Sequence, residues 1–139
     1  MYDFSGIWYH IIINIVLMFM CILNIIVFEK PFKKTFNWKK SKYFLSSLLA
    51  LALCSGLLLY YFCIIINPTV DVFVGEQYKQ YGRRGMDVCY HFENGFGDTK
   101  ALYLNTLSKN RIIQNGFDED IEYTIYYEKT TRIIVRVEK

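Results

Sequence analysis

Hydrophobic and polar positions divide the chain into two halves with different periods. In the first half, residues 7–28 and 43–66 are apolar runs without a single Asp, Glu, Lys or Arg. An α-helix rises 1.5 Å per residue, so about 20 residues cross the ~30 Å hydrocarbon core of a bilayer. Both runs are long enough. We therefore expect two transmembrane helices joined by a linker at residues 29–42.

After Pro68 the pattern changes to an alternation of apolar and polar positions, which is typical of half-buried β-strands. The alternating runs lie at residues 70–74, 88–92, 121–127 and 133–137. The turn-forming stretches GRRG, NGFGD and NG separate them, and residues 128–131 form a natural hairpin loop. Residues 99–116 hold either a further strand at 101–106, which we favour, or a short helix.

The apolar phase of each alternation should face the core of this half. The residues predicted to point inward are Val72, Tyr90, Phe92, Ile125, Val135 and Val137. Four or five short strands in so small a segment favour an antiparallel sheet or a barrel-like domain, since closure removes exposed edges. The predicted fold class is an α+β membrane protein, with a transmembrane hairpin at residues 1–66 and a β-domain at residues 67–139.

Positive charge is concentrated in the linker between the two apolar runs. Its lysines are Lys30, Lys33, Lys34, Lys39, Lys40 and Lys42. Neither residues 1–6 nor the exit from the second run at residues 67–72 contain Lys or Arg, and basic loops are retained in the cytoplasm. We therefore expect both chain ends to lie outside the cytoplasm. The linker lysines would also attract anionic lipid headgroups of the bilayer.

The order of charge and apolar run argues against a cleaved signal. A secretory signal peptide has its basic residues before the apolar run, whereas here they follow the first run. The stretch KKSKYFLSSLLALALC has the layout of a lipoprotein signal that ends at Cys54. However, Leu53 stands where a small residue is preferred, and the apolar run continues beyond the cysteine. An intact second span is the favoured interpretation.

With 139 residues, of which 53% are hydrophobic, the chain is more apolar than an ordinary soluble domain. Its four cysteines include no CxxC pair, and three of them lie in the apolar runs. Cys89, the one cysteine of the second half, has no disulfide partner there. The sequence contains no Gly-rich phosphate loop or nucleophile elbow, and we expect neither a cofactor nor a metal ion.

Small and polar residues recur at spacings of three and four on each predicted helix, so they mark one face of it. The candidate packing residues are Asn14, Cys21 and Asn24 in the first helix, and Ser47, Ala50 and Cys54 in the second. Such residues allow close helix approach. We favour a role in joining the hairpin over association with a second protein or copy. Transport is disfavoured because the runs lack carboxylates and basic residues for an ion path.

Three groups in the second half invite a chemical role. Cys89, His91 and Glu93 share one strand face, yet a thiol nucleophile needs a base within hydrogen-bond reach and zinc needs three or four ligands. Arg83 and Arg84 form a basic tip that suits phosphate or carboxylate, and they are the candidate partner-binding residues. The acidic residues 118–120 lack the spacing of a calcium loop. We expect no enzymatic activity.

The segment IEYTIYYEKTTRIIVRVE, with YHFENG upstream, resembles the closing hairpin of small β-domains appended to two-span bacterial membrane proteins of unassigned function. The resemblance covers about the second half of the chain, and it implies a multi-pass protein of the bacterial plasma membrane with an extracytoplasmic β-domain and no catalytic residues. The expected function is to bind a protein or envelope partner, or a second copy, and not nucleic acid. The alternative is an immunity protein that protects against a membrane-acting toxin or bacteriocin.

Overall fold

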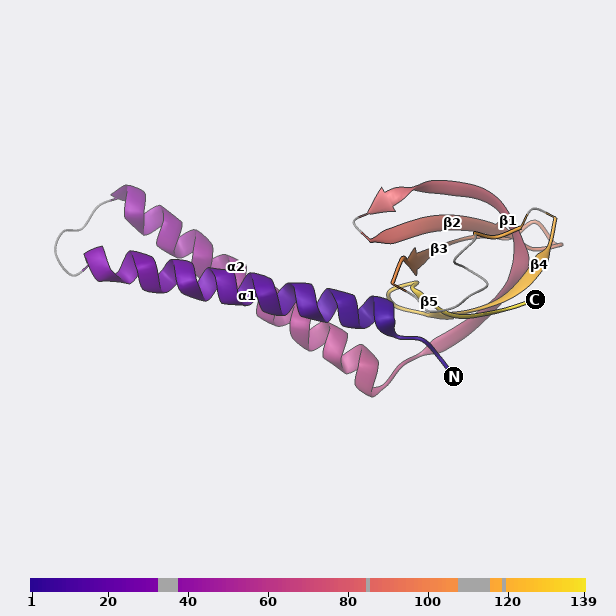
Figure 1. Ribbon diagram of the computed structural model, residues 1–139, viewed down its shortest axis with the longest axis horizontal. Helices are drawn as coiled ribbons and strands as arrows, with labels where there is room; N and C mark the ends of the chain where they lie inside the picture. Colours follow the sequence, from indigo (N-terminus) through magenta and orange to yellow (C-terminus); the bar gives the residue numbers. More distant parts are fainter. Residues whose placement is uncertain (33–37, 85, 108–115, 119) are drawn as a thin grey trace. The chain divides into compact units, whose positions relative to one another are not determined.

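The computed structural model describes residues 1–32, 38–84, 86–107, 116–118 and 120–139, and for residues 28–32, 38–41, 81, 83 and 84 it describes the backbone alone. The chain forms two compact units. One, the helical unit, consists of Tyr9–Ile64, and the other, which we call the β-unit, combines Met1–Trp8 with Ile65–Lys139. Two helices followed by a five-stranded sheet confirm the predicted α+β layout (Figure 1).

The two helices are α1 (Ser5–Phe32) and α2 (Trp38–Ile66), and the helical unit contains all but the first turn of α1 and the last two residues of α2. Both helices are long and apolar enough to cross a membrane, with candidate spans at Ser5–Val27 and Lys42–Ile66. Within this unit the imidazole ring of His10 stacks on the ring of Tyr61, with the ring centroids 5.3 Å apart.

The sheet contains five strands, β1 (Val70–Arg84), β2 (Asp87–Glu93), β3 (Thr99–Asn105), β4 (Glu122–Glu128) and β5 (Ile134–Glu138). They are hydrogen-bonded in the order β3-β2-β1-β4-β5, and every neighbouring pair is antiparallel. The presence of β3 confirms the strand that we favoured after residue 99. A short helix was the alternative for this segment, and its residues 108–115 lie outside the described residues.

The long strand β1 curves so that it serves two partners (Figure 1). Its residues 70–76 pair with β4, and its residues 76–84 pair with β2. A single parallel bridge joins Tyr103 of β3 to Ile133 beside β5, and the Tyr103 amide donates to the Arg132 carbonyl at 2.9 Å. The sheet is thus a partly closed barrel in which the neighbours run β1-β2-β3-β5-β4-β1, the connectivity of an OB-type Greek-key barrel.

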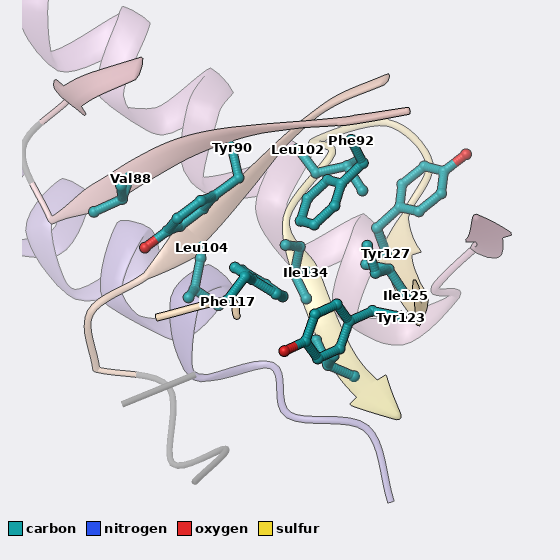
Figure 2. Packing of buried hydrophobic residues seen from close by; sticks show 11 residues of the cluster. Val88, Tyr90, Phe92, Leu102, Leu104, Phe117, Tyr123, Ile125, Tyr127 and Ile134 are labelled. Atoms are coloured by element: carbon teal, nitrogen blue, oxygen red, sulfur yellow. The ribbon is translucent and has the colours of Figure 1, made fainter. Parts of the chain in front are cut away.

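The core of the barrel is filled by apolar side chains from β2, β3, β4 and β5 and from one connecting segment (Figure 2), and the partly buried Phe73 of β1 packs against them. Its buried members are Val88, Tyr90, Phe92, Leu102, Leu104, Phe117, Tyr123, Ile125, Tyr127, Ile134 and Val137. Phe117 precedes β4 and packs edge-on against Tyr90 and Phe92, with ring centroids 4.9 Å apart in both cases. A side chain from the connection between β3 and β4 therefore completes the core.

Most of the predicted inward positions are confirmed. Tyr90, Phe92, Ile125, Val135 and Val137 are buried. The prediction for Val72 is wrong, because its side chain is 47% exposed. Apolar residues occupy both phases of this part of β1, and Phe73, which lies opposite Ile125, takes the inward phase and packs against the core. Asp71 shares that phase, where its carboxylate accepts a hydrogen bond from the Tyr127 hydroxyl at 2.8 Å.

Three consecutive residues, Ile133, Ile134 and Val135, are all buried, which simple alternation cannot achieve. A register shift of β5 against β4 at this point places Ile134 in the main core. The amino-terminal segment Met1–Trp8 accounts for the others: the Asp3 amide donates to the Val135 carbonyl at 2.7 Å, and Gly6 lies close to Ile133. These first residues therefore group with the sheet, whereas the sequence analysis assigned residues 1–66 to the transmembrane hairpin.

Candidate functional site

The strand face with Cys89, His91 and Glu93 is brought together on β2, as predicted. Burial raises the pKa of the Cys89 thiol, and a hydrogen bond with Tyr103 offsets this only in part, so the thiol stays protonated at neutral pH. Nδ1 of His91 lies 3.5 Å from the Tyr78 hydroxyl. Each of the two groups thus contacts a tyrosine of a neighbouring strand, and a protonated thiol is a poor nucleophile.

Arg83 and Arg84 lie within β1, where their backbones pair with Val88 and Asp87. Gly82, Arg83 and Arg84 of the predicted GRRG turn therefore belong to β1, because the β1–β2 pairing continues to the end of both strands. The side chains of both arginines lie outside the described residues. Their role in binding a partner stays a prediction.

The candidate packing residues of the helices differ in exposure. Asn14 is buried, and its Nδ2 donates to the His10 carbonyl one turn earlier at 2.8 Å. Cys21, Ser47, Ala50 and Cys54 are half-buried, whereas Asn24 is exposed. Lys42 is exposed, and the side chains of the other five linker lysines lie outside the described residues. A role of these residues in assembly or lipid binding remains a prediction.

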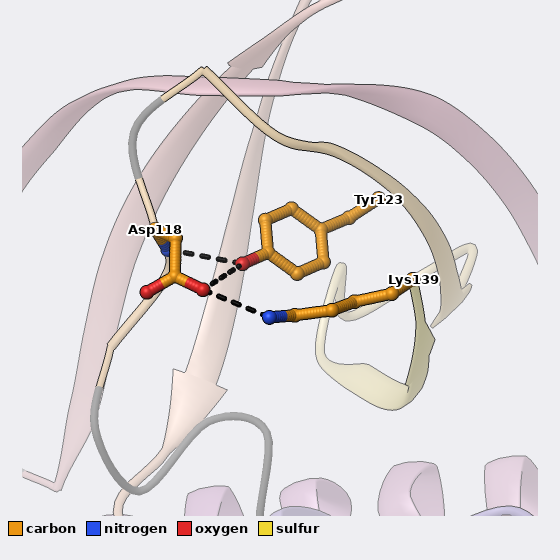
Figure 3. Close-up of polar contacts among 3 residues, drawn as sticks. All are labelled: Asp118, Tyr123 and Lys139. Atoms are coloured by element: carbon orange, nitrogen blue, oxygen red, sulfur yellow. Dashed lines mark hydrogen bonds and ion pairs between the residues drawn. The ribbon is translucent and has the colours of Figure 1, made fainter.

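The acidic stretch before β4 is tied to the end of the chain (Figure 3). Lys139 forms an ion pair with Asp118 at 2.9 Å, and the Tyr123 hydroxyl accepts from the Asp118 amide at 3.0 Å. The hydrogen bond and the charge of Lys139 lower the pKa of Asp118. Asp120 is exposed with a left-handed φ of 60°, and Glu119 lies outside the described residues. Among the described residues, no cluster of His, Cys, Asp and Glu suits a metal ion.

Two polar networks inside the barrel serve its structure. The carboxylate of Glu128, at the end of β4, accepts hydrogen bonds from the amides of Thr130 and Thr131 and from the hydroxyls of Thr131 and Thr69. Burial raises the pKa of this carboxyl, but the four donors outweigh it and the net pKa is lowered. The charged carboxylate of Glu128 therefore holds the β4–β5 loop through these hydrogen bonds.

The second network crosses the barrel. The ammonium of Lys100 on β3 contacts the hydroxyl of Tyr127 on β4 and lies 5.6 Å from the centroid of the Phe73 ring on β1. Tyr127 donates in turn to Asp71, and this hydrogen bond lowers the pKa of Asp71. Since β3 and β4 are not neighbours in the sheet, Lys100 connects strands that the backbone ladder does not join.

A surface feature that the sequence analysis missed lies where β1 changes partner. A pocket of about 460 Å³ is lined by residues 75–78 of β1, by residues 93–95, and by Asp120 and Glu122. Glu76 lies directly opposite Glu93 on one side and Glu122 on the other. Three exposed glutamates thus form one row across β2, β1 and β4, and like charges in such positions repel one another. We call this feature the carboxylate pocket.

No signal in the linear sequence marks the carboxylate pocket, because the three glutamates are separated by 17 and 29 positions along the chain. Their alignment depends on two strand registers at once. The pocket offers acceptors and negative charge, and the described residues of its lining include no Lys, Arg or Cys. Its chemistry is that of a surface that attracts cationic groups.

Comparison of the chain with family models, with curated proteins and with solved structures finds no match.

Proposed function

We propose that this chain is a non-enzymatic membrane protein whose two helices cross the bilayer and whose β-unit binds a protein or envelope partner outside the cytoplasm. The observation that carries the proposal is the exposure of large apolar side chains along both helices. Phe19 of α1 is 61% exposed, and Leu49 and Leu59 of α2 are 63% and 66% exposed. Apolar surface of this extent belongs against lipid or another protein.

The linker lysines support the orientation. Basic loops stay in the cytoplasm, so a cytoplasmic linker directs both ends of the hairpin to the opposite side. The β-unit contains Met1–Trp8 as well as Ile65–Lys139. Both ends of the hairpin therefore belong to one folded unit, and a topology with the two ends on the same side of the membrane satisfies that requirement.

Binding is favoured over catalysis by the chemistry of the β-unit. The Cys89 thiol is held protonated, and the described lining of the carboxylate pocket includes no Cys, Ser, Thr or Lys. An OB-type connectivity does not by itself indicate a nucleic-acid ligand. The carboxylates of Glu76, Glu93 and Glu122 would repel a phosphate backbone, which supports a partner other than nucleic acid.

Crosslinking in native membranes followed by mass spectrometry tests the proposal. The intact protein is compared with a variant in which the second span, residues 43–66, is replaced by polyleucine, and with an Arg83→Ala/Arg84→Ala variant. We expect the partner to crosslink to the β-unit and to persist in the polyleucine variant. Loss of the partner in the polyleucine variant alone would refute this function and favour a hairpin-centred immunity protein.

A further inference from the structure

The turn between β2 and β3 presents one large apolar side chain to solvent. Phe96 is 95% exposed, the highest value for any aromatic residue among the described side chains. Most of the large apolar residues with high exposure lie on the two helices, where a bilayer would cover them. Phe96 lies instead at the tip of a β-hairpin.

Hydrogen bonds hold this turn in one conformation. Oδ1 of Asn94 accepts from the amides of Phe96 at 3.0 Å and Asp98 at 2.8 Å, and Nδ2 of Asn94 donates to the Asp98 carboxylate at 3.1 Å. The Gly97 amide donates to the Asn94 carbonyl at 3.0 Å, with Gly97 in the left-handed region at φ 84°. These hydrogen bonds fix the turn, but they do not bury the Phe96 side chain, which is not part of the core.

A rigid aromatic anchor is what a binding surface needs. Aromatic side chains, Phe included, dominate the energetics of protein interfaces, and a preorganised loop avoids the entropy cost of ordering upon binding. The residues just before Phe96 also line the carboxylate pocket, namely Glu93, Asn94 and Gly95. The anchor and part of the pocket therefore belong to the same turn.

The negative charge of the carboxylate pocket indicates what kind of partner binds there. Its lining contains four carboxylates, from Glu76, Glu93, Asp120 and Glu122, and no basic residue among the residues that the structure describes. An anionic lipid surface would be repelled by this row. A second copy in a two-fold dimer would bring the same row against itself, because such an interface uses the same patch twice. A cationic chain relieves the repulsion among the glutamates and gains charge-assisted hydrogen bonds.

We infer that the Phe96 turn and the carboxylate pocket form one docking site for a Lys- or Arg-rich segment of a partner polypeptide that also carries apolar residues to cover the Phe96 ring. This inference rests on the proposal that the β-unit is a binding module, and it names the chemistry of the partner. Phe96 supplies the apolar anchor, and Glu76, Glu93 and Glu122 supply the charge that orients the segment.

The test uses the full-length chain in phosphatidylcholine nanodiscs and two fluorescein-labelled peptides, one alternating Lys with Leu and one alternating Glu with Leu. Fluorescence anisotropy, corrected with empty nanodiscs, measures their affinities. We expect the Lys–Leu peptide to bind and the Glu–Leu peptide not to bind. Phe96→Ser should weaken binding about tenfold or more, which is the size of an interface hot spot. Glu93→Gln should weaken binding and reduce its salt dependence.

Two control variants carry the same kinds of substitution at positions outside the docking site. Leu107→Ser removes a side chain that is 51% exposed just after β3, and Glu138→Gln removes one negative charge on β5. Both should leave the affinity within about twofold of the parent. Equal binding of both peptides would overturn the inference, and so would unchanged binding by the Phe96→Ser variant. Binding of the protein to vesicles that contain anionic lipid is measured as well. An effect of Phe96→Ser on vesicle binding but not on peptide binding would also overturn the inference. Retention of the native crosslinked partner by Phe96→Ser would overturn the inference and leave the proposed function standing.

Discussion

Gly75 lies one residue before Glu76, the position where β1 passes from its pairing with β4 to its pairing with β2. A Cβ built on Gly75 would stand 2.5 Å from the Glu93 carbonyl oxygen and 2.9 Å from the Phe73 ring. The backbone of β2 cannot withdraw without breaking the ladder, so glycine is required here for close approach and not for an unusual φ. The same approach brings Glu76 and Glu93 together beside the carboxylate pocket.

Gly75→Ala should therefore destabilise the β-unit by about 1–3 kcal/mol, the usual cost of overpacking. Thermal unfolding of the full-length chain in detergent, followed by circular dichroism, measures the change. Gly82→Ala is the matched control, since Gly82 is also in β1 and has open space around its Cβ position. Equal stability of the two variants would show that the strands can separate at Gly75 at no cost.

The carboxylate of Glu128 makes stability depend on pH. Its folded-state pKa lies below the ordinary value of 4.5, because donors from Thr131, Thr130 and Thr69 outweigh the effect of burial. A lowered pKa contributes stability that is fully present above the unfolded-state value and is lost as the pH falls through the folded-state value. We expect the β-unit to lose stability progressively below about pH 4.5.

Glu128→Gln tests that contribution. The amide carries no charge and presents donors where the protein also presents donors, so the variant should be less stable at neutral pH by about 1–3 kcal/mol. It should also lose less stability between neutral and acid pH than the parent does. Thermal unfolding across that pH range, followed by circular dichroism, measures both effects. An unchanged acid dependence in the variant would assign the pH response to other carboxyls, such as Asp71 and Asp118, whose pKa values are also lowered.

At the scale of elements, the connection between β3 and β4 supplies the centre of the core. Phe117 packs against Tyr90, Phe92 and Tyr123 (Figure 2). Next to it, Asp118 is held by Lys139 from the chain end and by Tyr123 from β4 (Figure 3). Phe117 and Asp118 are thus held by an apolar contact and a polar contact respectively.

Phe117→Ala should cost about 3–5 kcal/mol, because it removes a buried aromatic ring and leaves a cavity among three others. The loss of stability is measured by thermal unfolding of the full-length chain in detergent. Phe96→Ala provides the control, since Phe96 is 95% exposed and its loss should change stability by less than about 0.5 kcal/mol. Comparable destabilisation by both substitutions would place Phe96 in contact with the fold.

At the scale of the whole molecule, the central prediction is topology. In a variant without its four native cysteines, a cysteine at the exposed position Thr130 should react in intact cells with a membrane-impermeant thiol reagent, and a cysteine at Thr35 in the linker should not. Mass-tag labelling on gels measures both reactions, and labelling after cell lysis shows that each site is reactive. Labelling of the Thr35 variant alone in intact cells would reverse the orientation.

The sequence by itself determined the number and type of most elements, because each has a strong local signal. Two long apolar runs require helices in any apolar environment, and the alternation with turn residues located the strands that became β2, β4 and β5. The Asn–Gly–Phe–Gly–Asp turn could also be predicted from the local sequence, since Oδ1 of Asn94 accepts hydrogen bonds from amides only two and four residues further on.

Only the tertiary structure decided which residues lie together across elements. The inward phase of β1 could not be chosen from the sequence, because Val72 and Phe73 offer apolar side chains on both faces. The burial of Ile133 and Val135 depends on Met1–Trp8, which arrives from the other end of the chain. The carboxylate pocket likewise arises from two registers that align Glu93, Glu76 and Glu122. A pattern along the chain records only local preference, whereas register and packing depend on contacts between distant residues, so this site became visible only once the strands were paired.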